Sequence, residues 1–313
     1  MLTSVGMYTG KPYLCTMTHA LTPLRVACML RPRPADAHKG ILGHALLVAG
    51  SRGVGGCAVL AAESCLRSGV GKLTVCTPES NRLLVQMAVP EAVLRTLPDA
   101  SDTAVVALPV GDFPWQAIGM GPGIGLDADH LVNALLDSPH GMPLVLDADA
   151  LRILARHAEW MTRLHGRAVL TPHGGEMRAL AMCLLGQDVA CSDADALRAC
   201  AVRFASEYGV WVVLKGHPTL VCSPDGCIDT CPRGNAGMAT AGAGDVLTGI
   251  ITGLLAQGYG PAEAALLGVW QHATAGDLAA AQLGQETMLA RDITAHLHKA
   301  WAELHECLNN SRK

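Results

Sequence analysis

Three short apolar segments of this chain each end directly in polar residues, and this arrangement limits the folds open to it. The segments and the polar residues that follow them are 143–146 before Asp147, 168–170 before Thr171-Pro172-His173, and 210–214 before Lys215-Gly216. Short apolar runs bounded in this way are typical of buried parallel strands. In open α/β sheets, ligands bind outside the carboxyl ends of the strands. The pattern therefore predicts a parallel sheet with functional residues along one edge.

Strand-like and helix-like segments alternate along the rest of the chain. Further strands are expected at residues 44–50, 72–77, 104–108, 117–120, 219–223 and 227–231, with a hairpin turn at Pro224-Asp225-Gly226 between the last two. Helices are expected at residues 56–67, 245–257, 261–281 and 292–306. This order predicts an α/β fold with a mostly parallel central sheet and helices on both faces. We expect a single domain over residues 17–313. Residues 1–16 would form an N-terminal extension, or the start codon is placed too early and Met17 is the true start.

The composition excludes several classes of protein. The net charge of −4 gives no sign of the basic surface that a nucleic-acid-binding protein needs. No apolar run approaches the roughly 20 residues of a membrane span, and residues 1–30 make a poor signal peptide. The 12 cysteines contain no CxxC pair, and we interpret them, including Cys65, Cys76 and Cys183, as buried free thiols. We therefore expect a cytoplasmic protein with neither nucleic-acid nor membrane partners.

The sequence GAGD at residues 242–245 stands directly before a long apolar segment that resembles a helix. Glycines there let the backbone approach a ligand closely, and the first turn of a helix offers unpaired N–H groups to phosphate oxygens. A carboxylate beside them is placed to accept the proton of a hydroxyl that attacks a phosphoryl group. Asp245 is therefore predicted to be the catalytic base. The alternative is a carboxylate that only stabilises the helix start, but the additional glycines Gly234 and Gly237 favour the catalytic role.

Two strand ends offer further candidate residues. Lys215 supplies a point charge for phosphate and Gly216 allows close backbone approach, although a simple turn would use the same residues. His173 lies between a strand and a helix, where it can contact a substrate or orient a leaving group. Glu176, three residues later, is expected to stabilise the start of that helix.

Two glycine-rich loops follow other strands. Residues 49–58 read AGSRGVGGCA and residues 121–125 read GPGIG. Neither has the GxGxxG spacing of a dinucleotide-binding fingerprint, so each taken alone is interpreted as a tight turn.

Taken together and in this order, these segments resemble the ADP-dependent NAD(P)H-hydrate dehydratases, a carbohydrate-kinase-like family of the ribokinase superfamily. The motifs are HKG with Gly43 (38–43), AGSRGVGGCA (49–58), RSGVGKLTV (67–75), GPGIG (121–125), LDADAL (146–151), LTPHGGE (170–176), LKGHPT (214–219) and GNAGMATAGAGDVLTG (234–249). Eight motifs in family order make a far more specific signal than any one of them. The resemblance covers residues 36–295.

The resemblance implies a ribokinase-like fold and the repair of hydrated NADH or NADPH in its S form, NAD(P)HX. The enzyme would phosphorylate the ring hydroxyl with ADP, and loss of phosphate would restore NAD(P)H. Mg²⁺ is implied as a cofactor, and a homo-oligomer, often a tetramer, as the assembly. Many relatives carry an upstream epimerase domain, for which we expect too little sequence before His38.

The resemblance also assigns site residues by position, without a metal ligand from the protein. The adenine nucleotide would contact Lys215, Gly216, His217, Pro218, Thr219 and Gly244. The hydrated dinucleotide would contact Cys57, Gly123, His173 and Asp245.

The chain departs from the family pattern at five positions. They are Cys57 for the usual Ala, Gly174 for Pro, His217 for Asn, Ala243 for Ser or Thr, and Arg291 for Ser or Thr. All of them leave Asp245 in place. Two other functions stay open: a small-molecule kinase of the same superfamily, and a nucleotide-binding homologue without turnover, which Ala243 would favour. The sequence does not discriminate ADP from ATP, or NADHX from NADPHX.

Overall fold

A computed structural model describes residues 17–97, 115–137 and 141–311 of the chain. The strands are β1 (Thr18–Ala20), β2 (His44–Val48), β3 (Lys72–Pro78), β4 (Val93–Leu97), β5 (Ala117–Met120), β6 (Leu144–Leu146), β7 (Ala168–Leu170), β8 (Trp211–Leu214), β9 (Thr219–Cys222) and β10 (Ile228–Cys231). The α-helices are α1 (Pro23–Ala27), α2 (Gly56–Arg67), α3 (Arg82–Ala88), α4 (Asp129–Leu136), α5 (Ala148–Leu154), α6 (Gly174–Leu185), α7 (Ala194–Tyr208), α8 (Ala243–Ala256), α9 (Pro261–Leu283) and α10 (Ala290–Asn310).

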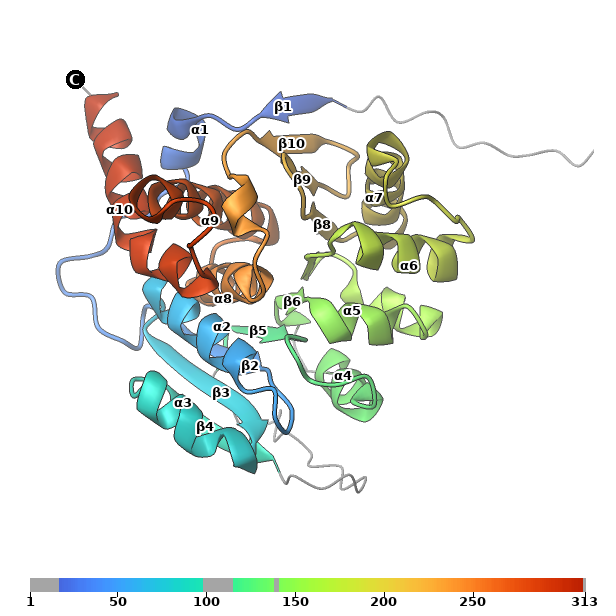
Figure 1. The fold of residues 1–313 in the computed structure, drawn as a ribbon, viewed down its shortest axis with the longest axis horizontal. Coiled ribbons are helices and arrows are strands. Elements are labelled where there is room, and N and C mark those ends of the chain that lie inside the picture. Colours follow the sequence, from blue (N-terminus) through green and yellow to red (C-terminus); the bar gives the residue numbers. More distant parts are fainter. Residues whose placement is uncertain (1–16, 98–114, 138–140, 312–313) are drawn as a thin grey trace, which may run out of the picture.

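All the named strands belong to one sheet of ten, in the order β1-β10-β9-β8-β7-β6-β5-β2-β3-β4 (Figure 1). Neighbouring strands are parallel except around β9, which runs antiparallel to both β8 and β10. The predicted mostly parallel sheet is confirmed, and so is the hairpin between β9 and β10. The strand expected at residues 104–108 and the extension expected at residues 1–16 lie outside the described residues.

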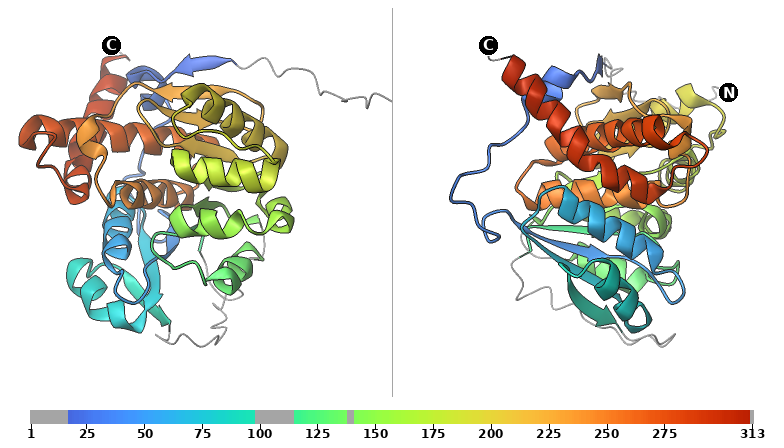
Figure 2. Two further views of the ribbon diagram at one scale, coloured as in Figure 1. Left: turned by 45° about the vertical axis from the view of Figure 1, so that its right-hand side comes forward. Right: turned by 60° about the vertical axis from the view of Figure 1, so that its left-hand side comes forward.

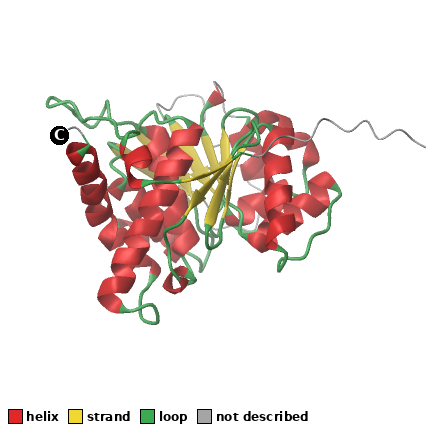
Figure 3. Ribbon diagram, turned by 90° about the horizontal axis from the view of Figure 1, so that it is seen from above, coloured by secondary structure: helices red, strands yellow, loops and turns green. Residues whose placement is uncertain are grey.

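Helices cover both faces of the sheet, as predicted (Figure 3). Side chains alternate along each strand, so that Leu47 and Val145 belong to the core on the side of α1, α2, α8, α9 and α10, whereas Leu46 and Leu146 belong to the core on the side of α4 to α7. Helices α9 and α10 lie against each other and extend the first of these layers beyond α8 (Figure 2). Among the described helices, none has both the length and the apolar character needed to cross a membrane.

One expectation about the cysteines is wrong. Cys65 and Cys76 are buried, but Cys183 is exposed. Helix α6 buries Glu176, Met177, Leu180 and Ala181, whereas none of residues 182–185 in its last turn is buried. An apolar neighbourhood in the sequence therefore did not mean burial there.

Close packing of α2 against α8 holds the start of α8 in place. A Cβ atom added at Gly249 would lie 2.1 Å from the carbonyl oxygen of Ala61, whereas one added at Gly56 would meet nothing within 4 Å. We expect Gly249→Ala to lower the free energy of unfolding by about 2–3 kcal/mol, the usual scale for overpacking, and Gly56→Ala to change it little. Urea unfolding of both variants measures the difference, and equal midpoints would contradict this account of the α2–α8 contact.

Candidate active site

Three of the predicted residues meet at the carboxyl ends of neighbouring strands. Asp147 follows β6, His173 follows β7 after two residues, and Lys215 follows β8. The backbone N–H of Lys215 donates to the carbonyl of Pro172 at 2.8 Å, and a β-bridge joins Lys215 to His173. The sheet therefore brings these side chains to one edge, as the sequence predicted.

A buried ion pair occupies this edge. The Nζ atom of Lys215 lies 2.7 Å from Oδ1 of Asp147 and 3.6 Å from Oε2 of Glu176. Burial alone would lower the pKa of Lys215, but the charges of Asp147 and Glu176 outweigh it and raise the pKa overall. Lys215 is therefore a cation at neutral pH, held at the mouth of the site.

Asp245 lies in the first turn of α8, next to this pair. The helix begins at Ala243, two residues earlier than expected, after Gly242 with a φ of +93° that favours glycine. Burial, followed by the negative charge of Asp147, raises the pKa of Asp245 to about 7, against the opposing effect of Lys215. A carboxylate with this pKa both accepts and releases a proton near neutral pH, which suits a general base.

The raised pKa of Asp245 predicts a pH-dependent cost to stability. The unfolded chain ionises Asp245 near its ordinary value of 3.8, whereas the folded protein resists ionisation up to about pH 7. Stability is therefore lost as the pH rises through this window. At about pH 8, Asp245→Asn should exceed the wild type in free energy of unfolding by about 2–4 kcal/mol.

This difference should shrink towards zero near pH 3, below the ordinary pKa of 3.8, because Asp245 is then mostly protonated in both states. Asp195→Asn, in the exposed first turn of α7, is the control and should show no comparable trend. Urea unfolding at both pH values tests this, and a variant that is no more stable at the higher pH would contradict the buried charge.

His173 and Glu176 together cap α6. The Nδ1 atom of His173 accepts from the backbone N–H of Gly175 at 3.0 Å and of Glu176 at 3.3 Å, while Oε2 of Glu176 accepts from the N–H of His173 at 2.8 Å. This reciprocal capping box confirms the role expected for Glu176. It also fixes the His173 ring, which remains exposed at the site.

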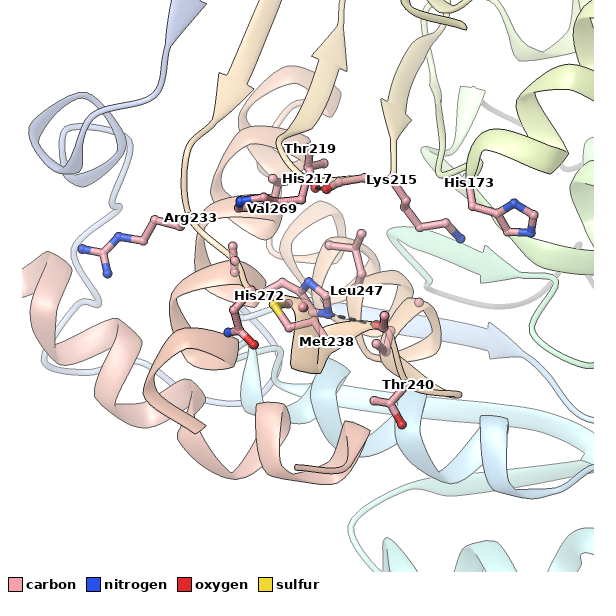
Figure 4. Close-up of a pocket in the computed structure, with 18 residues that line it drawn as sticks. His173, Lys215, His217, Thr219, Arg233, Met238, Thr240, Leu247, Val269 and His272 are labelled. Carbon is pink, nitrogen blue, oxygen red and sulfur yellow. Dashed lines mark hydrogen bonds between the residues drawn. The ribbon is translucent and has the colours of Figure 1, made fainter. Parts of the chain in front are cut away.

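A cavity of about 540 Å³ lies beside this edge, between the β8–β9 turn, the segment 233–244 and helices α8 and α9, and Asp245 is not among its lining residues. Five of the six predicted nucleotide-binding residues line this cavity: Lys215, Gly216, His217, Thr219 and Gly244 (Figure 4). His173 lines it as well. Pro218 belongs to the same turn but is not among the lining residues. The volume suits a ligand of nucleotide size.

Sequence reasoning missed a carboxylate–amide clamp that shapes one wall of this cavity. The Oδ1 and Oδ2 atoms of Asp277 accept from Nδ2 of Asn235 at 3.0 Å and from the N–H of Gly234 at 3.1 Å. Oδ1 of Asn235 accepts in turn from the N–H of Gly237 at 3.0 Å. Two features of the sequence could have indicated these contacts: the glycine-rich segment around Asn235 and the Gly-Asp pair at 276–277.

His272 forms part of the cavity floor and was also missed as a site residue. Its Nε2 atom lies 2.9 Å from the carbonyl oxygen of Ala243 (Figure 4). Burial, the largest effect, lowers the pKa of His272 to about 4, so the ring is neutral at physiological pH and donates this hydrogen bond. The backbone of Ala243 is thereby fixed although its side chain carries no hydroxyl.

Cys57 and Gly123 lie together, outside the lining of the cavity. The Sγ atom of Cys57 donates to the carbonyl of Pro122 at 3.2 Å, and a Cβ atom at Gly123 would lie 2.6 Å from this sulfur. Burial and the charge of Asp245 raise the pKa of Cys57 to about 12, so the thiol stays protonated. Of the four predicted dinucleotide residues, His173 lines the cavity, whereas Cys57, Gly123 and Asp245 are not among its lining residues.

A divalent cation held by protein side chains alone does not fit this site. Among residues 17–97, 115–137 and 141–311, no group of three or more His, Cys, Asp or Glu side chains could hold a metal ion. The buried carboxylates of Asp147 and Glu176 are bridged by Lys215 instead. Mg²⁺ in nucleotide sites is commonly held through substrate phosphates, water and one or two carboxylates, an arrangement that needs no such group.

Comparisons with known proteins agree with this geometry. A family model described as NAD(P)H-hydrate dehydratase matches residues 45–299. The chain is 41% identical over 261 residues to the ADP-dependent (S)-NAD(P)H-hydrate dehydratase of Neisseria meningitidis, which covers 82% of this chain and 84% of that protein. It is 39% identical over 297 residues to the bifunctional NAD(P)H-hydrate repair enzyme Nnr of Moorella thermoacetica, covering 91% of this chain and 54% of that protein.

A solved structure is also similar. The ADP/ATP-dependent NAD(P)H-hydrate dehydratase from Bacillus subtilis, co-crystallised with ATP/Mg²⁺, matches with a TM-score of 0.75 at 31% identity, over 90% of this chain and 97% of that one. The fold is therefore ribokinase-like, as predicted. The chain spans about half the length of the bifunctional relatives that it matches.

Proposed function

We propose that this chain, which belongs to the NAD(P)H-hydrate dehydratase family, uses ADP to dehydrate the S form of hydrated NADH or NADPH back to NADH or NADPH. The observation that carries the proposal is the place of Asp245. Asp245 lies in the first turn of α8, and its carboxylate interacts electrostatically both with Lys215, which lines the cavity, and with Cys57, which lies outside the lining. One base would thus lie near both a nucleotide in the cavity and a second substrate beside Cys57.

The proposed reaction begins at Asp245, which takes the proton of the ring hydroxyl. The hydroxyl oxygen attacks the β-phosphorus of ADP, the bond from this phosphorus to the bridging oxygen breaks, and AMP leaves. The ring carbon then loses its phosphate with the bonding electrons, and a proton leaves the neighbouring carbon to form the double bond. The products are NADH or NADPH, AMP, phosphate and the released proton.

The residues lining the cavity would bind the adenine nucleotide. We propose Lys215, Gly216, His217, Pro218, Thr219 and Gly244 as its contacts, and Cys57, Gly123, His173 and Asp245 as contacts of the hydrated dinucleotide. Lys215 would offset the charge of the transferred phosphoryl group, which the N–H groups of the first turn of α8 would also bind. Mg²⁺ would enter with the nucleotide and supply further charge neutralisation.

Three further proposals rest on the sequence and on family resemblance. Residues 17–313 would form one domain, with residues 1–16 as an extension. The chain would assemble as a homo-oligomer, a tetramer in the usual arrangement, and would act in the cytoplasm on small-molecule substrates without nucleic-acid or membrane partners.

Incubation with hydrated NADH, Mg²⁺ and either ADP or ATP tests the proposed function. We expect the near-ultraviolet absorbance of NADH to return, with one AMP and one phosphate formed per NADH when ADP is the donor. A stable phosphoester product instead would indicate a small-molecule kinase. Binding of ADP without conversion at any Mg²⁺ concentration would indicate a homologue that has lost turnover, as Ala243 would favour.

A further inference from the structure

Asp147 was predicted only as a polar strand end, yet it lies at the centre of the contacts around the site. We propose that Asp147 is a positioning residue: it fixes the ammonium group of Lys215 beside the first turn of α8, and Thr248 fixes Asp147 in turn. This inference rests on the proposed nucleotide site, because it assigns Lys215 its place relative to the phosphate.

Both oxygens of Asp147 are occupied by separate partners. Oδ1 accepts from Nζ of Lys215 at 2.7 Å, and Oδ2 accepts from Oγ1 of Thr248 at 2.7 Å. The Asp147 side chain is only 2% exposed. A buried carboxylate with both oxygens engaged has a fixed orientation, so Thr248 on α8 determines where Asp147 on β6 holds the lysine on β8.

The ion pair lies close to the backbone of α8 at Gly244. A Cβ atom at Gly244 would lie 3.3 Å from Nζ of Lys215 and 3.6 Å from Oδ2 of Asp147. The ion pair therefore lies directly against the backbone whose N–H groups face an incoming phosphate. Fixing a free lysine side chain costs rotamer entropy, and the ion pair removes much of this freedom before the nucleotide binds.

Glu176 cannot replace Asp147 in this role. Its Oε2 atom is 3.6 Å from Nζ of Lys215 and already accepts the N–H of His173 at 2.8 Å. Glu176 is therefore committed to the cap of α6, and Asp147 is the nearer anchor of the ammonium group.

The charge of Asp147 also affects the pKa of Asp245, which gives a second property to measure. After burial, Asp147 is the largest cause of the raised pKa of Asp245, which Lys215 opposes; Cys57, the thiol facing Asp245 from α2, stays protonated. Replacing Asp147 by a neutral residue should therefore lower the pKa of Asp245. A residue with a purely structural role would not shift the pH dependence in this direction.

The test compares Thr248→Val, its matched control Thr248→Ser, and Asp147→Asn, each by ADP titration calorimetry and by the pH profile of kcat/KM. Loss of a hydrogen bond to a charged group costs about 1.5 kcal/mol, so Thr248→Val should weaken ADP binding about tenfold and change kcat less. Thr248→Ser keeps the hydroxyl, so its ADP affinity should stay near the wild-type value. Asp147→Asn should weaken ADP binding at least as much and move the acid limb of the profile to lower pH.

Wild-type ADP affinity in a folded Thr248→Val variant would overturn the inference, and so would an unshifted acid limb in Asp147→Asn. If Asp147→Asn does not fold, the Thr248 pair decides, because it leaves the carboxylate in place. Failure of the proposed function is a separate result: the wild-type protein would then bind no ADP or convert no hydrated NADH.

Discussion

Asp245→Asn is expected to lower kcat by 10²–10⁴-fold, the usual scale for loss of a positioned general base. The amide keeps the size of the side chain but cannot take the proton of the ring hydroxyl. The change also removes a partly buried negative charge, so the fold should survive and the free protein should gain stability above neutral pH. Steady-state kinetics with hydrated NADH and ADP measure the loss.

Binding of ADP should be preserved in this variant, because Lys215 and the cavity residues are unchanged. Asp195→Asn is the matched control, since Asp195 is a carboxylate in the first turn of another helix, α7. It should leave kcat near the wild-type value. Turnover of Asp245→Asn within a few-fold of the wild type would remove Asp245 from the chemistry and leave it as a helix-stabilising residue.

Lys215→Met is expected to have the second largest effect, on both stability and nucleotide binding. The change leaves the buried carboxylate of Asp147 without its ion-pair partner, and breaking a buried pair typically costs about 3–5 kcal/mol. It also removes the cation beside the first turn of α8. We therefore expect a lower urea midpoint and an ADP affinity reduced at least tenfold, measured by unfolding and calorimetry.

The double variant Asp147→Asn/Lys215→Met separates these two effects. It removes both charges together, so it should recover much of the lost stability, because a neutral pair needs no ionic partner. ADP binding should stay weak, since the lysine is still missing. Recovery of ADP affinity along with stability would show that Lys215 stabilises the fold and does not bind the nucleotide. Lys215-Gly216 would then be a simple turn, which is the alternative that the sequence offers.

The strand ends and the start of α8 were predictable because their signals are local. Each apolar run is short enough to be a strand, and the polar residue after it marks the edge, as at Asp147 and Lys215. The glycines around Asp245 likewise mark a helix start that approaches a ligand. β4 was missed because it is an edge strand whose residues stay partly exposed and lack a clear apolar run.

The contacts that organise the site were not predictable, because they join distant segments. Asp147 and Lys215 are 68 residues apart, and Asn235 and Asp277 are 42 apart. Nothing in the local sequence states which carboxylate an amide or ammonium will meet. The pairing follows from strand order and helix packing, which a single sequence does not specify.

In the proposed reaction the ring hydroxyl is phosphorylated and leaves as phosphate, with Asp245 as the base. Hydrated NADH carrying a heavy oxygen isotope in the ring hydroxyl tests this most directly, with the enzyme, ADP and Mg²⁺ in a single turnover. Mass spectrometry should find the label in the released phosphate, in an amount equal to the NADH formed, and almost none with Asp245→Asn in the same time. Label in water, with unlabelled phosphate, would contradict the account.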